Sequence, residues 1–269
     1  MPNIITESEA WFDEYLAEQG YTVQVEPDLG VPTRPDRLIA RAGMEAICEV
    51  KEFTTDAISR RFPSGESHAG TFGPREWFLT VRRTISSAAR QLEPLAGDGR
   101  PLVILLANPN GVHVPLDPDE LIQAMYGDLT ITFDVSRETG AAVSEPVWTV
   151  GDNGRLADEQ APWVSAVGRI RRRDRELEWH RDWIAQWKAE QGLEAAAMYE
   201  DAFAVWQAYT EELERVKQLE DVPTGIYFSI DLIETLSDTA AVVPRDLFDA
   251  EGDRRWSFDP EQSAIVRVR

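Results

Sequence analysis

The chain has 269 residues, and 48 acidic against 27 basic side chains give it a formal net charge of −21 at pH 7. A hydrophobic fraction of 43% with nine Trp provides for a folded core and excludes global disorder. A single cysteine, Cys48, excludes an intrachain disulfide and favours a reducing compartment. Because a field of this sign repels polyanions, the net charge argues against nucleic acid as a partner unless a local site provides for it.

The sequence indicates a soluble, cytoplasmic protein with no membrane partner. It opens without the basic and apolar segments of a secretory signal. Its apolar run at residues 102–107 is far shorter than the ~20 residues that a membrane-spanning helix needs. Only three of the basic residues are Lys. Scarce Lys with strong acidity is typical of a salty cytoplasm, whereas an excess of Arg is also typical of a GC-rich genome, and both explanations stay open.

The first half of the sequence alternates between helical and strand patterns. Thr6 and Glu9 have the spacing of a capping box, which predicts a helix over residues 6–19. Apolar residues at helical spacing follow Pro74 and predict a second helix over residues 74–95. Strands are expected at residues 21–26, 36–41, 45–53 and 102–107. The last of these is continuously apolar, which is typical of a strand in a sheet covered on both faces.

The second half returns to strands after a long helical interruption. A short helix is expected at residues 119–126, and strands at 129–135, 147–150, 164–170, 225–233 and 264–268. Between them, residues 173–222 have two helical patterns broken near Gln191 and Gly192, with 13 acidic and 6 basic side chains, a net charge of 6 − 13 = −7. We therefore expect one α/β domain, residues 1–172 plus 223–269, interrupted by a helical hairpin insertion over 173–222.

One constellation of charged residues indicates chemistry. If Ala42 and Gly43 form a two-residue hairpin turn, the residues whose numbers sum to 85 face each other, so Asp36 faces Glu49. The Cβ atoms of such a pair are about 5 Å apart, and both carboxylates could then reach one ion. Lys51 points to the same side as Glu49 because side chains alternate along a strand. The opposite side of this strand is apolar and is expected to pack under a helix: Ala46, Cys48 and Val50.

Two carboxylates with open coordination positions suit Mg²⁺, which keeps several waters and takes its other ligands from substrate phosphate. The ion would lower the pKa of a bound water and neutralise charge on the phosphoryl oxygens. A neighbouring Lys51 would hold the attacking water or stabilise the transition state. Asp28 is a rival for the position of Asp36, and an exposed strand face on which Glu49 and Lys51 form a surface pair is the structural alternative.

The pairs Pro35-Asp36 and Glu49-Val50-Lys51 on this hairpin resemble the motif of the PD-(D/E)xK nuclease superfamily. The order of expected elements over roughly residues 6–107 is similar too: helix, three strands, helix, strand. The resemblance implies a restriction-endonuclease-like mixed β-sheet flanked by helices, and an endonuclease that hydrolyses DNA phosphodiester bonds.

In that family pattern Asp36 and Glu49 would bind Mg²⁺ or Mn²⁺, and Lys51 would be the catalytic lysine. Many members add an acid from the first helix, which here would be Glu14. Some place a Gln on the helix after the hairpin, which here would be Gln91.

Contacts to DNA phosphates are expected from residues 54–92, where six Arg exceed three acids by three charges. These are Arg60, Arg61, Arg75, Arg82, Arg83 and Arg90. A solvated face of mixed charge is the alternative. A second basic cluster at residues 169–175 is expected to anchor the helical insertion rather than to follow a DNA backbone.

The helical insertion is a poor DNA clamp at its charge of −7 and is expected to form a homodimer or to bind a protein partner. Its Trp179, Trp183 and Trp187 recur every four residues, which favours packing in a helical core over base stacking. The alternative to a nuclease is therefore a catalytically silent protein of the same fold that acts as an interaction module through this insertion.

Overall fold

The computed structural model describes residues 5–54, 74–132, 134–137, 139–141, 143–144, 147–150, 154–156, 160–190, 202–219, 221–259 and 264–267. The chain divides into two compact units, Met1–Arg171 with Ser229–Arg269, and Arg172–Phe228. The predicted insertion, residues 173–222, falls inside the second unit. Among the described residues, no helix is long and apolar enough to cross a membrane.

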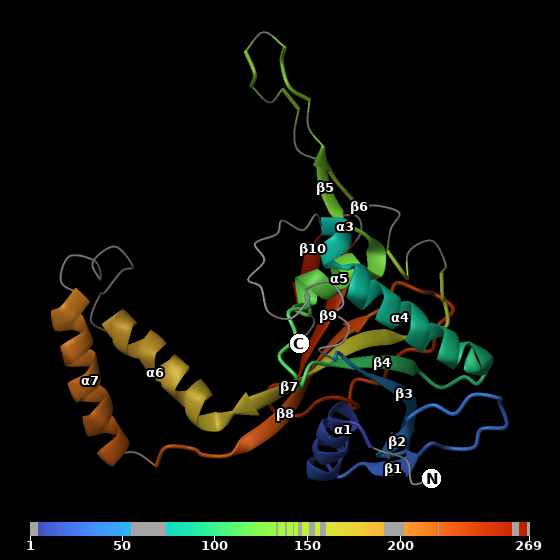
Figure 1. The fold of residues 1–269 in the computed structure, drawn as a ribbon, viewed down its shortest axis with the longest axis horizontal. Coiled ribbons are helices and arrows are strands. Elements are labelled where there is room, and N and C mark those ends of the chain that lie inside the picture. The colour runs from blue at the N-terminus through green and yellow to red at the C-terminus, as the bar shows by residue number, and fades with distance from the viewer. Residues whose placement is uncertain are drawn as a thin grey trace, which may run out of the picture. The chain divides into compact units, whose positions relative to one another are not determined.

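A mixed sheet forms the centre of the fold (Figure 1). In the described residues it has eight strands in the order β1-β2-β3-β4-β7-β8-β9-β10. The strands are β1 (Thr22–Val25), β2 (Arg37–Arg41), β3 (Met44–Glu52), β4 (Leu102–Ala107), β7 (Ala166–Asp174), β8 (Ile226–Glu234), β9 (Arg254–Asp259) and β10 (Ala264–Arg267). The first three pair antiparallel, whereas β3, β4 and β7 run parallel. A mixed α/β fold with a helix-flanked sheet was predicted, and this is confirmed.

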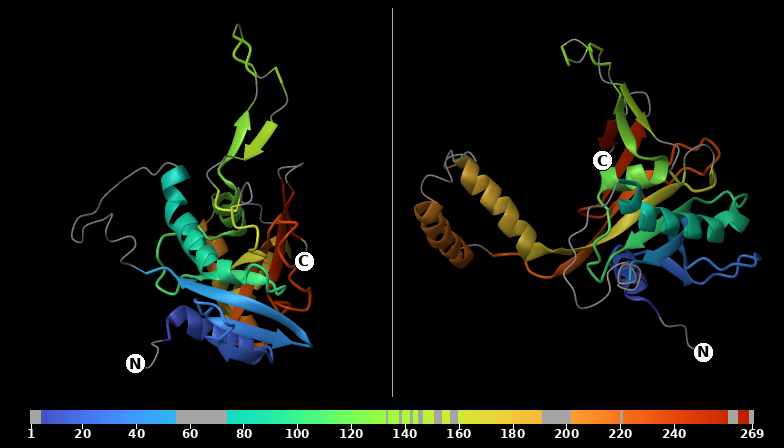
Figure 2. Two further views of the ribbon diagram at one scale, coloured as in Figure 1. Left: turned by 90° about the vertical axis from the view of Figure 1, so that its right-hand side faces the viewer. Right: turned by 45° about the horizontal axis from the view of Figure 1, so that its top comes forward.

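Helices cover both faces of this sheet. Helix α1 (Glu7–Glu18) lies on one face, and α4 (Leu79–Leu92) and α5 (Pro118–Tyr126) lie on the other (Figure 2, left). The predicted capping box opens α1, since Thr6 accepts from the backbone N–H of Glu9 and the Glu9 carboxylate accepts from that of Thr6. The predicted helix over residues 74–95 is three pieces: α3 (Pro74–Trp77), α4 and the 3₁₀ turn η1 (Glu93–Leu95).

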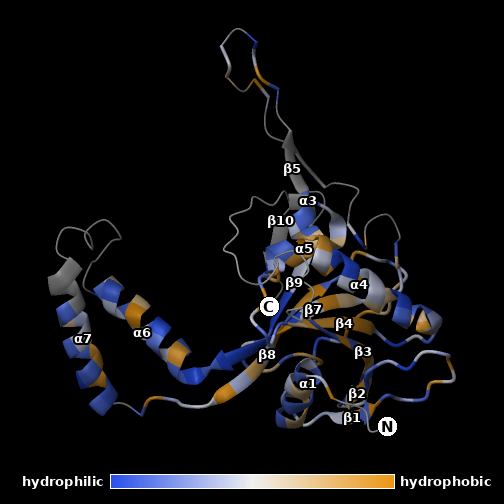
Figure 3. Cartoon of the chain, viewed as in Figure 1, coloured by the Kyte–Doolittle hydropathy of each residue, from blue (hydrophilic) through white to orange (hydrophobic). Residues whose placement is uncertain are grey.

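The core lies between the sheet and the α4–α5 layer. Ile47 of β3, Ile104 of β4 and Ile85 of α4 belong to one buried apolar cluster. All six residues of β4 are buried, as expected for a strand covered on both faces, and hydrophobic colours follow β3 and β4 in Figure 3. Because Ile47 faces α4, alternation places Glu49 and Lys51 on the α4 side of β3.

The remaining elements are a separate ladder and the helices of the second unit. Strands β5 (Leu129–Thr132) and β6 (Val147–Val150) pair with each other in a two-stranded sheet. Helices α6 (Arg175–Glu190) and α7 (Ala202–Leu219) make up most of the second unit.

Candidate active site

The hairpin of β2 and β3 has the predicted register. Arg41 pairs with Met44 and Arg37 with Cys48, so the paired numbers sum to 85. Ala42 and Gly43 both have positive φ angles, 51° and 80°, as a two-residue type I′ turn requires. The opposite side of β3 is buried as predicted, and burial raises the pKa of the Cys48 thiol, which leaves it unreactive.

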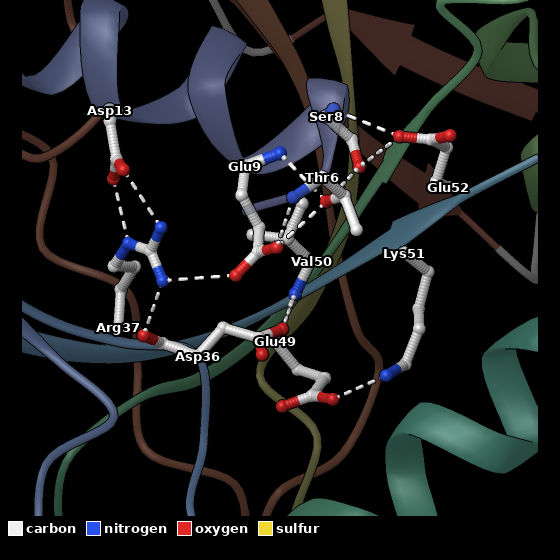
Figure 4. Close-up of polar contacts among 10 residues, drawn as sticks. All are labelled: Thr6, Ser8, Glu9, Asp13, Asp36, Arg37, Glu49, Val50, Lys51 and Glu52. Carbon is white, nitrogen blue, oxygen red and sulfur yellow. Dashed lines mark hydrogen bonds and ion pairs between the residues drawn. The ribbon is translucent and has the colours of Figure 1, made fainter. Parts of the chain in front are cut away.

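The side chains of Asp36, Glu49 and Lys51 lie close together next to the last residue pair of this hairpin, Arg37 and Cys48 (Figure 4). Asp36 stands directly before β2, and its Oδ2 accepts a hydrogen bond of 2.7 Å from the backbone N–H of Val50. Lys51 Nζ lies 2.5 Å from Oε1 of Glu49. The Glu49 side chain has no exposed surface, and its Oε2 is buried without a hydrogen-bond partner among the described residues. One buried carboxylate oxygen is therefore left to bind something else.

The electrostatics of the pair indicate a shortage of positive charge. Burial, followed by the negative charge of Asp36, raises the pKa of Glu49 to about 7, and Lys51 only partly opposes this. Burial also raises the pKa of Asp36, with a further contribution from Glu9, against the lowering effects of the Val50 N–H and Lys51. A cation between the two carboxylates would relieve both costs.

The donor set fits a small divalent ion. The described residues contain no group of three or more His, Cys, Asp or Glu side chains that could hold a metal. Mg²⁺ does not need such a cage, since one or two carboxylates suffice when water and phosphate complete its shell. The unpartnered Oε2 of Glu49, with Asp36 beside it, therefore fits Mg²⁺ or Mn²⁺.

A buried arginine ties α1 to this site. Arg37 has no exposed side-chain surface and points to the α1 side of the sheet. Its guanidinium binds both carboxylate oxygens of Asp13, at 2.6 and 2.8 Å, and Oε1 of Glu9 at 3.2 Å. It also donates a 2.8 Å hydrogen bond to the backbone carbonyl of Asp36. The position of Asp36 is therefore set from two sides, by Val50 through its carboxylate and by Arg37 through its backbone.

The other predicted site residues lie differently. Glu14 is exposed on α1, and the acid of α1 that raises the pKa of Asp36 is Glu9. Gln91 is half-buried on α4, where its backbone carbonyl accepts from Thr33. The rival ligand Asp28 is exposed and pairs with Arg34 at 3.7 Å, so the structure favours Asp36 over it.

The six arginines that were predicted to contact phosphate have different outcomes. Arg60, Arg61 and the side chain of Arg75 lie outside the described residues. The prediction for Arg82 is wrong. Its side chain is 2% exposed, forms an ion pair with Asp128 and donates a hydrogen bond to the backbone carbonyl of Gln123. It therefore joins α4 to the end of α5 and has no surface for DNA. Arg83 and Arg90 are exposed on α4, where their expected contact with phosphate stays a prediction.

Lys51 and Arg169 are far apart in the sequence but lie on the same face of the sheet. Lys51 pairs with Leu106 of β4, which pairs with Arg169 of β7, two strands or about 10 Å away. Arg169 and Arg254 both bind the buried carboxylate of Asp231, at 2.8 and 2.6 Å.

Arg171 joins this cluster with its Nε 3.0 Å from Oδ2 of Asp231. Burial opposes the ionisation of Asp231, but the three guanidinium groups outweigh it and hold the pKa of Asp231 below its usual value. Asp117 takes part of the charge of Arg169, and the charge of Asp253 acts on Arg171. Three guanidinium groups therefore meet three carboxylates in this cluster.

No family model, curated protein or solved structure matches the chain. The geometry is therefore the only guide to chemistry. Two partly repelling carboxylates, an ammonium group and a nearby cluster of guanidinium groups are suited to binding a divalent cation together with an anion.

Proposed function

We propose that the protein is a Mg²⁺-dependent nuclease that hydrolyses DNA phosphodiester bonds, built on a restriction-endonuclease-like fold. Asp36 and Glu49 hold the ion, and Lys51 assists the attacking water. The supporting observation is the convergence of these three side chains on one hairpin, with Oε2 of Glu49 buried and unpartnered among the described residues. The order helix, three strands, helix, strand agrees with the fold of the family that the motif resembles.

The bound ion would supply a water of lowered pKa and neutralise charge on the phosphoryl oxygens. The residues of the chain do the rest. Arg37 and the N–H of Val50 hold Asp36 in place. Lys51 pairs with Glu49 and offsets part of its charge, and its side chain is 24% exposed. With a cation held by Glu49, the ammonium of Lys51 would be available to hold the attacking water or to stabilise the phosphate charge.

Two arginines would contact the phosphate despite the net charge of −21. Arg169 lies in the same cross-strand row as Lys51, and Arg254 stands beside it on Asp231. Their side chains are 17% and 28% exposed, so part of each is accessible to solvent. Such local contacts lose affinity steeply with salt, because each phosphate contact releases counterions.

Nuclease assays on supercoiled and linear DNA, single-stranded DNA and RNA with Mg²⁺ or Mn²⁺ test the proposal. Asp36→Asn and Glu49→Gln should abolish Mn²⁺ binding measured by titration calorimetry. Lys51→Met should keep metal binding and lower the cleavage rate by about 10²–10³-fold. Glu45→Gln is the matched control, since Glu45 is an exposed acid of the same strand.

A folded wild-type protein that cleaves none of these substrates and binds no Mn²⁺ through Asp36 and Glu49 would refute the nuclease. That result would leave the alternative, a catalytically silent protein of this fold acting as an interaction module. Equal losses in Glu45→Gln would show instead that the substitutions act through the net charge.

A further inference from the structure

Helix α6 carries a ladder of stacked indole rings. Trp179 and Trp183 have ring centroids 6.3 Å apart, and Trp183 and Trp187 have theirs 6.2 Å apart. Tyr209 of α7 meets this ladder, with its ring 5.6 Å from Trp183 and 5.8 Å from Trp187. Only Trp187 is buried, whereas Trp179 and Trp183 remain half-exposed. The predicted core packing therefore holds at one end of the ladder, and Trp179 and Trp183 keep part of their indole surface exposed.

The three Trp side chains line a cleft of about 410 Å³ within the second unit. Trp187 and Val216, both buried, belong to its lining. Three carboxylates also line it: Asp182, Glu190 and Glu212. The stretch of α6 from Trp179 to Glu190 is ~16 Å long, so the cleft is the size of a few side chains rather than of one small ion.

The charge of the lining selects the occupant. Three carboxylates face a single guanidinium, Arg215, which is already paired with Glu212. The lining therefore has a net charge of 1 − 3 = −2. Asp182 is 72% exposed and pairs with the exposed Arg181 at 3.1 Å, a surface ion pair of the weak kind that a ligand cation can replace. Indole faces attract organic cations, and carboxylates at the rim strengthen that preference.

Other occupants fit this chemistry poorly. Nucleic acid could stack bases on the indoles, but its phosphates would meet the three carboxylates. A second copy of the chain would bring another surface of the same sign, from a molecule with a net charge of −21. A bare metal ion makes no use of aromatic faces.

We propose that this cleft binds a basic, partly apolar segment of a partner protein, with a Lys or Arg side chain over Trp179 and Trp183 and its charge between Asp182 and Glu190. Aliphatic side chains of the same segment would cover Val216 and the edge of Trp187. The mode is that of a helix or extended peptide in a groove, where apolar anchors give affinity and charge gives specificity. It is independent of the metal site.

Calorimetric titration of the full chain with two synthetic peptides tests this inference. The first peptide has Arg and Leu at helical spacing over about 12 residues, and the second has Glu in place of every Arg. The basic peptide should bind, and its affinity should fall with salt, while the acidic peptide should not bind. Asp182→Asn with Glu190→Gln should weaken binding by at least tenfold without loss of helicity.

Substitutions in the ladder separate cation–π binding from charge alone. Trp183→Ala should weaken binding, and Trp183→Phe should restore most of it. Glu211→Gln is the matched control, because Glu211 is an exposed acid of α7 outside the cleft. Equal binding of both peptides, an equal effect of Glu211→Gln, or a concentration-dependent dimer that Trp183→Ala breaks would each overturn the proposal.

Discussion

Replacing Arg37 by Met tests how the candidate site is held. The guanidinium of Arg37 has no exposed surface and makes four hydrogen bonds, two to Asp13, one to Glu9 and one to the carbonyl of Asp36. Met fills a similar volume but leaves both carboxylates of α1 without their cation. Arg37→Met should therefore destabilise the fold and also loosen Asp36.

The size of the loss follows from the exposure of the stranded acids. Removing one partner of a buried ion pair costs roughly 3–5 kcal/mol. The side chains of Asp13 and Glu9 are 34% and 17% exposed, so water recovers part of their solvation. We expect a loss of about 3 kcal/mol in the free energy of unfolding, at the lower end of that range. Arg37→Lys keeps the positive charge but lacks the planar guanidinium, so its free energy of unfolding should lie between those of the wild type and Arg37→Met.

Urea denaturation at pH 7 in a chelating buffer measures this loss, and a double-mutant cycle with Asp13→Asn isolates the pair. The coupling free energy between Arg37 and Asp13 should reach at least about 1 kcal/mol, because both oxygens of Asp13 are engaged. An Arg37→Met protein that unfolds at the wild-type urea concentration would refute the reasoning. A large loss with no coupling to Asp13 would place the stabilisation elsewhere.

Three further predictions concern the turn, a buried acid and the arginine row. Ala42→Asn should stabilise the fold by about 0.5–1 kcal/mol in urea denaturation, because φ at position 42 is 51° and Asn accepts the left-handed region more readily than Ala; a loss would contradict the type I′ turn. Burial raises the pKa of Asp253 to about 6 from 3.8, so the folded state holds this proton more tightly than the unfolded state. The free energy of unfolding should therefore fall by roughly 3 kcal/mol as pH rises from 4 to above 6, and Asp253→Asn should flatten that slope; an unchanged slope would assign it to other groups. Arg254→Gln should raise the KM for DNA and reduce the salt dependence of cleavage by about one phosphate contact at an unchanged kcat, whereas a lower kcat alone would show that Arg254 does not contact substrate.

The hairpin could be predicted from sequence because its determinants are local. A two-residue turn fixes which residues face each other, and alternation then fixes the side of every residue along β3. The prediction that Asp36, Glu49 and Lys51 gather needed no information from distant segments. The capping box of α1 was predictable for the same reason, since Thr6 and Glu9 are three residues apart.

The errors at the site come from partners that are remote in sequence. Arg82 looked like a free cation because its partner Asp128 lies 46 residues away, on the chain just after α5. Glu9 was assigned to the capping box, and nothing in the sequence shows that its carboxylate also reaches Arg37. The family pattern points instead to Glu14, as an acid from the first helix, although this side chain faces solvent.

Strand β9 was missed because it begins with two arginines and only Trp256 and Phe258 give it apolar alternation. Arg254 and Arg255 are tolerated there because the neighbouring β8 supplies Asp231 and Glu234 as partners. The basic cluster at residues 169–175 divides between two sets of partners. Arg169 binds Asp231, 62 residues further along, which the sequence does not show. Arg173 pairs with Glu178 of α6, as the expected anchoring of the helical insertion requires.

The two charge patterns of the molecule are compatible once they are considered locally. A net charge of −21 would hold DNA away from most of the surface. Near the hairpin, however, Lys51 offsets part of the charge of Glu49, and three guanidinium groups surround Asp231. A divalent cation in place of Lys51 on Glu49 would add positive charge at that point and would free an ammonium group as well. Metal binding would therefore do more than activate water, because it would also make this part of an acidic protein attract a phosphodiester.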